Sequence, residues 1–201
     1  MGKAYANRKK ESERPENDFY QTPYSLTKVL VETGILDNCH HILEPACGQG
    51  AISRILEEYG FEVTSRDLVL GNDFLLDDYS NEKYDAIVTN PPFDLWDKFV
   101  EKAKTINCNK IIFIGRLNYF GGHARNVNGI WNGLSDIYVF DRMVAYDKVL
   151  REDGKFETGC LVTGWFVWTN QYSGEPKVHI LDVQDYVVSK KEKQNENQSS
   201  L

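Results

Sequence analysis

The tetrapeptide Asn90-Pro91-Pro92-Phe93 is the segment of this chain best suited to chemistry on a flat, amino-bearing group. An exocyclic amine on an aromatic base is a poor nucleophile because its lone pair is delocalised into the ring. Two acceptors that bind its hydrogens would draw the nitrogen toward a tetrahedral shape and free that pair. The side-chain carbonyl of Asn90 and the backbone carbonyl of Pro91 are candidate acceptors, and the two prolines stiffen the backbone.

Phe93 offers a face on which a planar base can stack, an interaction worth about 1–3 kcal/mol per base. The apolar run 84–89, directly before the tetrapeptide, predicts a buried strand. Ligands of open α/β sheets bind at the carboxyl ends of such strands. An ordinary proline-rich turn that closes a strand is the competing interpretation, because Asn-Pro is a common turn signal.

A second candidate segment runs from His41 to Ile52, where an apolar strand leads through Gly48-Gln49-Gly50 into a helix. Glycines there let the backbone approach a ligand, and the helix presents unpaired N–H groups. Ser53 replaces the third glycine of the dinucleotide fingerprint and the acidic Glu44 precedes the turn, which favours a cationic or amine-bearing cofactor over a pyrophosphate. A plain strand-to-helix turn would also explain this segment.

Two acidic residues follow in order. Asp67 ends a predicted strand at 61–67, where a carboxylate can accept hydrogen bonds from ribose hydroxyls. Asp73 can accept a proton of an adenine amino group, and Phe74 can pack on the ring. Without the other segments, Asp67 would be a solvated strand-end acid and the residues at 73–74 an unremarkable loop.

Taken together, these motifs resemble those of the S-adenosylmethionine-dependent amino-methyltransferases, specifically the DNA adenine-N6 methyltransferases. The matching segments are Asp18-Phe19-Tyr20-Gln21-Thr22-Pro23, Glu44-Pro45-Ala46-Cys47-Gly48-Gln49-Gly50, Asp67, Asp73-Phe74 and Asn90-Pro91-Pro92-Phe93. With the first segment ahead of the glycine turn, the order is similar to the gamma arrangement of that family. The resemblance covers about residues 18–120 by motif.

The resemblance implies a role for each matching residue, with S-adenosyl-L-methionine as the cofactor. The residues expected to hold the cofactor are Tyr20, Thr22 and Pro23 on the methionine carboxylate side, Glu44, Ala46, Gly48 and Gly50 along the methionine and backbone, Asp67 at the ribose, and Asp73 with Phe74 at the adenine. Asn90 and Pro91, in the corner stiffened by Pro92, would orient the target amine, and Phe93 would stack on the flipped base. No covalent enzyme intermediate is needed, so catalysis would be mainly positioning.

Alternating strand and helix patterns predict an α/β, doubly wound sheet that positions these residues. Strands are expected near 41–45, 62–66, 84–89, 110–115 and 136–140, with helices near 23–33, 50–59 and 95–105. Two late strands, 159–168 and 177–183, are expected to form a pair joined by a turn at 172–176. The resemblance implies a Rossmann-like class I methyltransferase fold, with a seven-stranded, mostly parallel sheet, a late antiparallel strand and helices on both faces.

Length and composition predict one domain at 17–188, between disordered polar tails at 1–16 and 189–201. The chain of 201 residues is 41% hydrophobic, with no apolar run long enough for a membrane span and no signal-peptide pattern. The four cysteines and four histidines show neither disulfide nor metal-ligand spacing, so no metal site is expected. Cys47 is interpreted as a small packing residue, and a reducing cytoplasm as the location.

The net charge of −7 does not exclude nucleic acid, because the local surface facing the phosphates decides binding. Between residues 116 and 151 basic residues outnumber acidic ones, and the segment 118–123 is glycine-rich. This stretch, with Trp131, is therefore the expected substrate-facing loop, and Arg116 and Arg125 are the expected substrate-binding residues. A merely solvated surface loop is the alternative.

DNA adenine-N6 methylation is the expected function, with nucleic acid as the partner. The same chemistry on RNA adenine or on a protein glutamine is a second hypothesis, and a non-catalytic cofactor-binding subunit is a third. Only about thirty residues follow Trp168, so no separate target-recognition domain is indicated. Selectivity would then come from loops, come from a partner subunit, or be slight. The pattern resembles that of the small stand-alone enzymes of phages and prophages. The sequence leaves open the recognised site and the oligomeric state.

Overall fold

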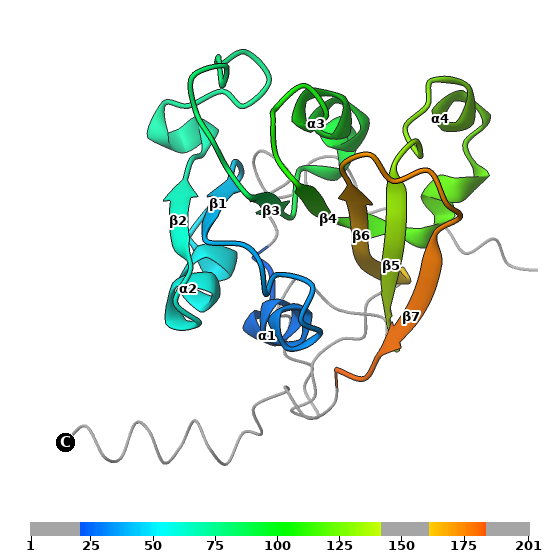
Figure 1. The fold of residues 1–201 in the computed structure, drawn as a ribbon, viewed down its shortest axis with the longest axis horizontal. Helices are drawn as coiled ribbons and strands as arrows, with labels where there is room; N and C mark the ends of the chain where they lie inside the picture. The colour runs from blue at the N-terminus through cyan, green and yellow to red at the C-terminus, as the bar shows by residue number, and fades with distance from the viewer. Residues whose placement is uncertain (1–20, 142–160, 184–201) are drawn as a thin grey trace, which may run out of the picture.

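The computed structural model describes residues 21–141 and 161–183, which form a seven-stranded sheet between two layers of helices (Figure 1). The strands are β1 (His41–Glu44), β2 (Glu62–Ser65), β3 (Ala86–Thr89), β4 (Lys110–Arg116), β5 (Leu134–Phe140), β6 (Thr163–Thr169) and β7 (Lys177–Leu181). Their order across the sheet is β2-β1-β3-β4-β6-β5-β7. All pair in parallel except β6, which runs antiparallel to both β4 and β5.

The central strands are buried on both faces, which explains their continuous apolar sequences. All four residues of β3 are buried, as are the middle five of β4 and the first six of β6. The edge strand β2, in contrast, has no buried residue. Strands such as these must be covered by helices on both sides.

Three amphipathic helices provide that cover, each with its apolar side chains at helical spacing. Leu26, Val29 and Leu30 of α1 (Tyr24–Glu32), together with Ile52 and Leu56 of α2 (Ala51–Glu58), pack on one face. On the opposite face, α3 (Trp96–Ala103) buries four side chains, Trp96, Phe99, Val100 and Ala103. Figure 1 shows α1 and α2 on one side of the sheet and α3 with the short α4 on the other. The predicted fold class, strands and three helices are confirmed.

The late part of the sheet differs from the prediction in one respect. We expected 159–168 and 177–183 to pair with each other, but β6 and β7 are not neighbours. Strand β5 lies between them, so that β7 pairs in parallel with β5 from Asp136↔Lys177 to Phe140↔Leu181. The turn at 172–176 reverses the chain but leads it past β5 to the edge of the sheet.

The first part of the stretch 116–151, which was predicted to be a substrate-facing loop, also differs from the prediction. Residues 117–127 form a 3₁₀ helix, η5 (Leu117–Gly121), followed by the α-helix α4 (His123–Val127). Tyr119 of η5 is buried and its ring packs 4.8 Å from that of Trp96. The start of the substrate-facing stretch is thus anchored to the core, whereas its residues 142–151 lie outside the described residues, as do the two tails.

The order of the strands determines where a ligand can bind. From β1 the chain crosses to β2 on one side and then returns to β3 on the other side of β1, which makes a topological switch point between β1 and β3. Open α/β sheets bind their ligands at such a point, outside the carboxyl ends of the strands. The glycine turn follows β1 and the Asn-Pro-Pro-Phe segment follows β3, so both motifs meet there.

Candidate active site

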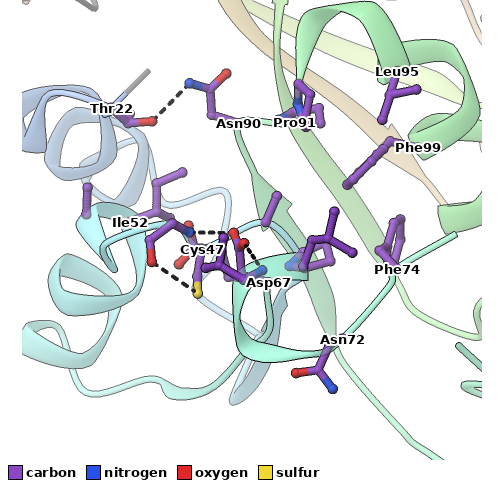
Figure 2. A pocket seen from close by; sticks show the side chains of 18 of the residues that line it. Thr22, Cys47, Ile52, Asp67, Asn72, Phe74, Asn90, Pro91, Leu95 and Phe99 are labelled. Atoms are coloured by element: carbon purple, nitrogen blue, oxygen red, sulfur yellow. Dashed lines mark hydrogen bonds between the residues drawn. The ribbon is translucent and has the colours of Figure 1, made fainter. Parts of the chain in front are cut away.

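A cavity of about 820 Å³ lies at this switch point. It is lined by the segments that follow β1, β2 and β3 (45–49, 67–75 and 90–95), by the start of α2 and by Gln21 and Thr22 ahead of α1. Figure 2 shows Thr22, Cys47 and Ile52 on one side of it and Phe74, Leu95 and Phe99 on the other, with Asn90 and Pro91 between them. Segments far apart in the sequence therefore form one site.

The glycine turn adopts the backbone conformation that its residues allow. Gly48 and Gly50 have φ values of 52° and 76°, in the left-handed region that side chains disfavour. Gly50 is the N-cap of α2, and the amide of Cys47 donates to the carbonyl of Arg66 at 3.0 Å, which ties the turn to the end of β2. Gly48 lines the cavity, whereas Gly50 shapes the turn without being among the lining residues.

Asp67 connects two of the loops. One carboxylate oxygen accepts from the Gly48 amide at 2.8 Å and the other from the Val69 amide at 3.0 Å, where Asp67 caps the 3₁₀ helix η3 (Leu68–Leu70). Asp67 is thus partly buried and holds two backbone amides, beyond what a solvated strand-end acid would do. Because each carboxylate oxygen can accept more than one hydrogen bond, Asp67 retains acceptor capacity on the cavity side.

Glu44 lies beneath the turn, with 1% of its surface exposed. Its carboxylate accepts from the Ser53 amide at 2.7 Å and also from the Ser53 hydroxyl, so it satisfies an orphan N–H of the first turn of α2. Burial, with a smaller contribution from the nearby charge of Asp67, raises the pKa of Glu44 to about 8. The sequence did not reveal that Ser53, in place of the fingerprint's third glycine, is the partner of this acid.

Ala46, Asp73 and Phe74 all line the cavity. Asp73 Oδ1 accepts from the Leu75 amide at 3.0 Å and so holds its own loop in shape. Phe74 is buried, with its ring 4.9 Å from that of Phe99 on α3. It contributes to the apolar core as well as to the cavity wall, which the sequence alone did not indicate.

Asn90 follows the last residue of β3 and lines the cavity. Its Nδ2 donates to the hydroxyl oxygen of Thr22 at 3.1 Å, and Figure 2 shows the amide oxygen turned away from Thr22. That oxygen, Oδ1, is buried without a hydrogen-bond partner among the residues that the structure describes. An orphaned buried acceptor costs about 1–3 kcal/mol, so a donor that bound this oxygen would stabilise the site.

The rest of the tetrapeptide forms a rigid corner. The carbonyl of Pro92 accepts from the Leu95 amide at 3.0 Å and closes the 3₁₀ helix η4 (Phe93–Leu95), which leads directly into α3. Pro91, Pro92 and Phe93 all line the cavity. Phe93 is partly buried against the core, and the guanidinium of Arg116, at the end of β4, lies 4.0 Å from its ring centre.

The two arginines expected to bind the substrate are placed differently from each other. Arg116 stacks on Phe93, and its Nε is buried without a hydrogen-bond partner in the described part of the chain. Arg125 on α4 forms an ion pair with Asp97 at 2.7 Å and stacks on Tyr119 at 4.3 Å. Neither is among the cavity-lining residues, and Trp131 packs against Phe120 and Trp168 in an aromatic cluster behind them.

The remaining sequence-predicted residues fall in three groups. Tyr20 lies outside the described residues, Thr22 lines the cavity, and Pro23 is the N-cap of α1 without lining the cavity. The sequence reasoning missed several lining residues, notably Leu68, Val69, Asn72 and Asp94. The sequence signal for Leu68 and Val69 was their position, as apolar residues directly after the strand-end acid.

Within residues 21–141 and 161–183 no cluster of three or more His, Cys, Asp or Glu side chains could hold a metal ion. None of the helices there has the length and apolar character to span a membrane. Cys47 is buried, and its burial raises the pKa of the thiol to about 11, which makes it a poor nucleophile near neutral pH.

Comparison with known proteins adds information on the fold. No protein-family model and no curated protein sequence matches the chain. Among solved structures, the chain is similar to a modification subunit of a putative type I restriction enzyme from Vibrio vulnificus, with a TM-score of 0.54 and 13% identity over 81% of this chain and 47% of that one. A putative hemolysin from Lactococcus lactis has a TM-score of 0.53 and 9% identity over 83% of this chain and 98% of that one. For TehB from Haemophilus influenzae the TM-score is 0.50 and the identity 15%, over 72% of this chain and 62% of that one.

The chain therefore spans less than half the length of the restriction-enzyme subunit that it matches. At these identities the likenesses establish a common fold. Together with the strand order and the single antiparallel strand, they identify a Rossmann-like α/β fold with a mostly parallel sheet.

Proposed function

We propose that this chain transfers a methyl group from S-adenosyl-L-methionine to the exocyclic N6 amine of adenine in DNA. The observation that carries the proposal is the orphaned Oδ1 of Asn90, a buried acceptor in a proline-stiffened corner of a cavity that also contains the glycine turn. An amine hydrogen is the donor that this oxygen lacks. The alternatives of RNA adenine, protein glutamine and a non-catalytic cofactor-binding subunit become outcomes of the test below.

The cavity fits the proposed cofactor in charge. S-adenosylmethionine carries a sulfonium, an ammonium and one carboxylate, and is therefore a net cation. The ionisable residues that line the cavity include four acids, Glu44, Asp67, Asp73 and Asp94, and no described lining residue is a lysine, arginine or histidine. Since Glu44 is held protonated below a pH of about 8, Asp67 is the acid that supplies negative charge beside the glycine turn.

The polar groups of the cavity fit the cofactor as well. Gly48 has no side chain to obstruct a ligand that lies across the turn, and Asp67 retains acceptor capacity for ribose hydroxyls. Asp73 and Phe74 follow Asp67 in the segment 67–75 and also line the cavity, where they would hold an adenine ring. Thr22 and Ala46 line the methionine side in this arrangement.

S-adenosylmethionine supplies the methyl carbon when it is bound: a C–N bond forms as the C–S bond breaks, sulfur keeps the electron pair, and the nitrogen gives up one proton to water. The chain itself acts on the amine. Asn90 Oδ1 and the carbonyl of Pro91 accept its two hydrogens, which draws the lone pair out of conjugation and toward the methyl carbon. Phe93 stacks on the base and fixes its plane, so that catalysis is positioning rather than covalent chemistry.

DNA is the proposed substrate for two reasons. The motifs Asn90-Pro91-Pro92-Phe93 and Glu44-Pro45-Ala46-Cys47-Gly48 resemble those of the DNA adenine-N6 methyltransferases, and one solved structure with this fold is a modification subunit of a putative restriction enzyme. Arg116 and Arg125 are proposed to act on the substrate side, Arg116 by supporting the stacking ring and Arg125 at a phosphate. A partner subunit could supply sequence selectivity, and cytoplasmic location remains part of the proposal.

The test uses the full chain and labelled S-adenosylmethionine with duplex DNA, ribosomal RNA and protein in separate reactions. We expect label in DNA adenine and none above background elsewhere. Asn90→Ala should abolish transfer while leaving the cofactor affinity, measured by calorimetry, within about threefold, because only the amine loses its acceptor. Asn81→Ala, at an exposed turn outside the cavity, is the matched control and should behave as the wild type.

Three results would contradict the proposal. Equal methylation by the Asn90→Ala variant would remove Asn90 from the mechanism. Label in RNA or in protein glutamine, with none in DNA, would replace the substrate. Tight cofactor binding without transfer to any of the three would identify a non-catalytic subunit.

A further inference from the structure

Thr22 and Asn90 are 68 residues apart in the sequence but share a hydrogen bond at the wall of the cavity. Thr22 lies just ahead of α1 with 6% of its surface exposed, and Asn90 follows β3. The donor is Nδ2 of Asn90, and the acceptor is Oγ1 of Thr22 at 3.1 Å. The resemblance assigns Thr22 to the cofactor alone, so this contact is not accounted for by that role.

The orientation of the Asn90 amide decides whether the corner can act on an amine. An amine hydrogen needs an acceptor, and only Oδ1 is one, because Nδ2 carries two hydrogens of its own. If the amide were rotated by half a turn, Nδ2 would meet the amine and two donors would face each other. The proposed chemistry therefore requires that Nδ2 be held on the side away from the amine.

Thr22 supplies what that orientation needs. A buried N–H that lacks an acceptor is costly, so the Thr22 hydroxyl favours the orientation in which Nδ2 donates to it. A hydroxyl can donate as well as accept and would by itself tolerate either orientation of the amide. The target amine then favours one of the two orientations, because its hydrogens can bind only when Oδ1 faces it. In that orientation Thr22 accepts a hydrogen bond from Nδ2, as in this structure.

We propose that Thr22 is a positioning residue for the reaction, which acts through Asn90 by accepting from its Nδ2 and so presents Oδ1 to the target amine. This inference rests on the proposed function, since it assigns Oδ1 to an amine. It differs from a cofactor-contact role in what Thr22 controls: the rate of transfer and the binding of the base, rather than the affinity for the cofactor.

The chain offers a matched set of variants. Thr22→Val removes the hydroxyl and keeps the branched shape, and Thr22→Ser keeps the hydroxyl. Thr27→Val is the control, because Thr27 is a fully buried threonine on α1 whose hydroxyl has no hydrogen-bond partner in the described residues and which does not line the cavity. The three variants separate loss of the acceptor from loss of a buried hydroxyl in general.

We expect Thr22→Val to lower kcat by about ten- to a hundredfold, the range for a buried donor left without its partner, with cofactor affinity within about threefold. Thr22→Ser should recover kcat to within about threefold of the wild type, and Thr27→Val should leave it unchanged. Binding of adenine-containing DNA supplies a double-mutant cycle: Thr22→Val should weaken it in the wild-type background but have no further effect once Asn90 is alanine.

A second measurement does not depend on methyl transfer. In ¹⁵N-labelled protein the side-chain amide of Asn90, assigned from the Asn90→Ala variant, can be followed by NMR as its hydrogens exchange with solvent. The exchange should accelerate at least tenfold in Thr22→Val and remain slow in Thr22→Ser and Thr27→Val. If the wild type methylates nothing yet this pattern is found, the proposed function fails while the Thr22 contact is upheld.

Two results would overturn the inference. One is a Thr22→Val variant with weakened cofactor binding and unchanged kcat, which would make Thr22 a cofactor contact alone. The other is a Thr22→Val variant in which the Asn90 amide exchanges at the wild-type rate and DNA binding falls by the same factor in the wild-type and Asn90→Ala backgrounds. This result would show that Thr22 acts independently of Asn90.

Discussion

The guanidinium of Arg116 lies 4.0 Å from the centre of the Phe93 ring, so one face of that ring is covered by a cation from the neighbouring strand β4. Such a cation–π contact stabilises a partly exposed ring by about 0.5–1 kcal/mol. A base that stacks on Phe93 therefore meets a ring that is already held in place. Under the proposed function, Arg116 would therefore support base stacking rather than act as a free surface charge.

Arg116→Ala should weaken the binding of 2-aminopurine-labelled DNA by about threefold to fivefold, because Phe93 loses its support. Phe93→Leu should weaken it more, since the stacking face itself is lost, and fluorescence titration measures both. Arg116→Lys keeps the charge without the planar group and should fall between the wild type and Arg116→Ala. A decrease of about one in the salt slope for Arg116→Ala would instead indicate a phosphate contact.

Asp97→Asn should strengthen the binding of DNA, because Asp97 holds Arg125 in an ion pair at 2.7 Å. Freed from that carboxylate, Arg125 can pair with a phosphate, so the dependence of log K on log salt should steepen by up to about one. Arg125→Ala should change affinity and slope in the opposite direction. Titrations with DNA at four salt concentrations measure the affinity and its salt dependence. Identical slopes for the wild type and both variants would place nucleic acid away from α4.

Asp67→Asn should lower the affinity for S-adenosylmethionine by at least about tenfold, although the shape of the side chain is unchanged. The carboxylate accepts from the amides of Gly48 and Val69 with different oxygens, and an amide side chain can satisfy only one of them. Calorimetry measures the affinity. Asp78→Asn is the control, because Asp78 is exposed and supports only the turn to Ser80. Unchanged affinity in Asp67→Asn would separate this acid from the cofactor.

Glu44 should make the stability of the fold depend on pH. Burial raises the pKa of its carboxyl from 4.5 to about 8, so between these values the folded chain keeps a proton that the unfolded chain has lost. Stability should therefore fall as the pH rises from about 5 to 8, by at most about 1.4 kcal/mol per pH unit, and level off above 8. Glu44→Gln mimics the protonated acid and should flatten this part of the profile. Urea denaturation between pH 5 and 9 tests both proteins.

Gly164→Ala should destabilise the sheet by about 1–3 kcal/mol, the cost of overpacking a core. Gly164 of β6 lies opposite Val139 of β5, and a β-carbon there would collide with the carbonyl oxygen of the preceding Tyr138. Gly121→Ala is the control, since a β-carbon there meets nothing within 4 Å and the backbone is not left-handed. The shift of the urea midpoint measures the difference, and equal midpoints would mean that β5 and β6 are farther apart than described.

The strands and the three main helices could be predicted because their signals are local. Buried parallel strands need continuous apolar sequences, and α1, α2 and α3 each carry apolar residues at helical spacing. The neighbours of β7 were predicted wrongly, because a turn signal shows that the chain reverses but not which strand already occupies the adjacent position. Here that position belongs to β5.

The candidate site could be predicted in its members but not in its contacts. Asn90, Gly48 and Asp67 were each identified from residue type and position. The bonds of Asp67 to Gly48 and of Thr22 to Asn90 join residues that are 19 and 68 positions apart, and such pairs depend on how the elements pack. The roles assigned to these residues remain predictions.

The two motif-bearing loops leave neighbouring strands, and the register of those strands, Ile42 opposite Ala86 and Leu43 opposite Ile87, is fixed by the sheet. Under the proposed function, the offset between methyl donor and acceptor would follow from the spacing of adjacent strands, about 4.8 Å, in one of the stiffest frameworks a protein can build. Warming would not gradually misalign the two reactants. Turnover should persist until the central ladder itself melts, and then vanish in the same cooperative transition.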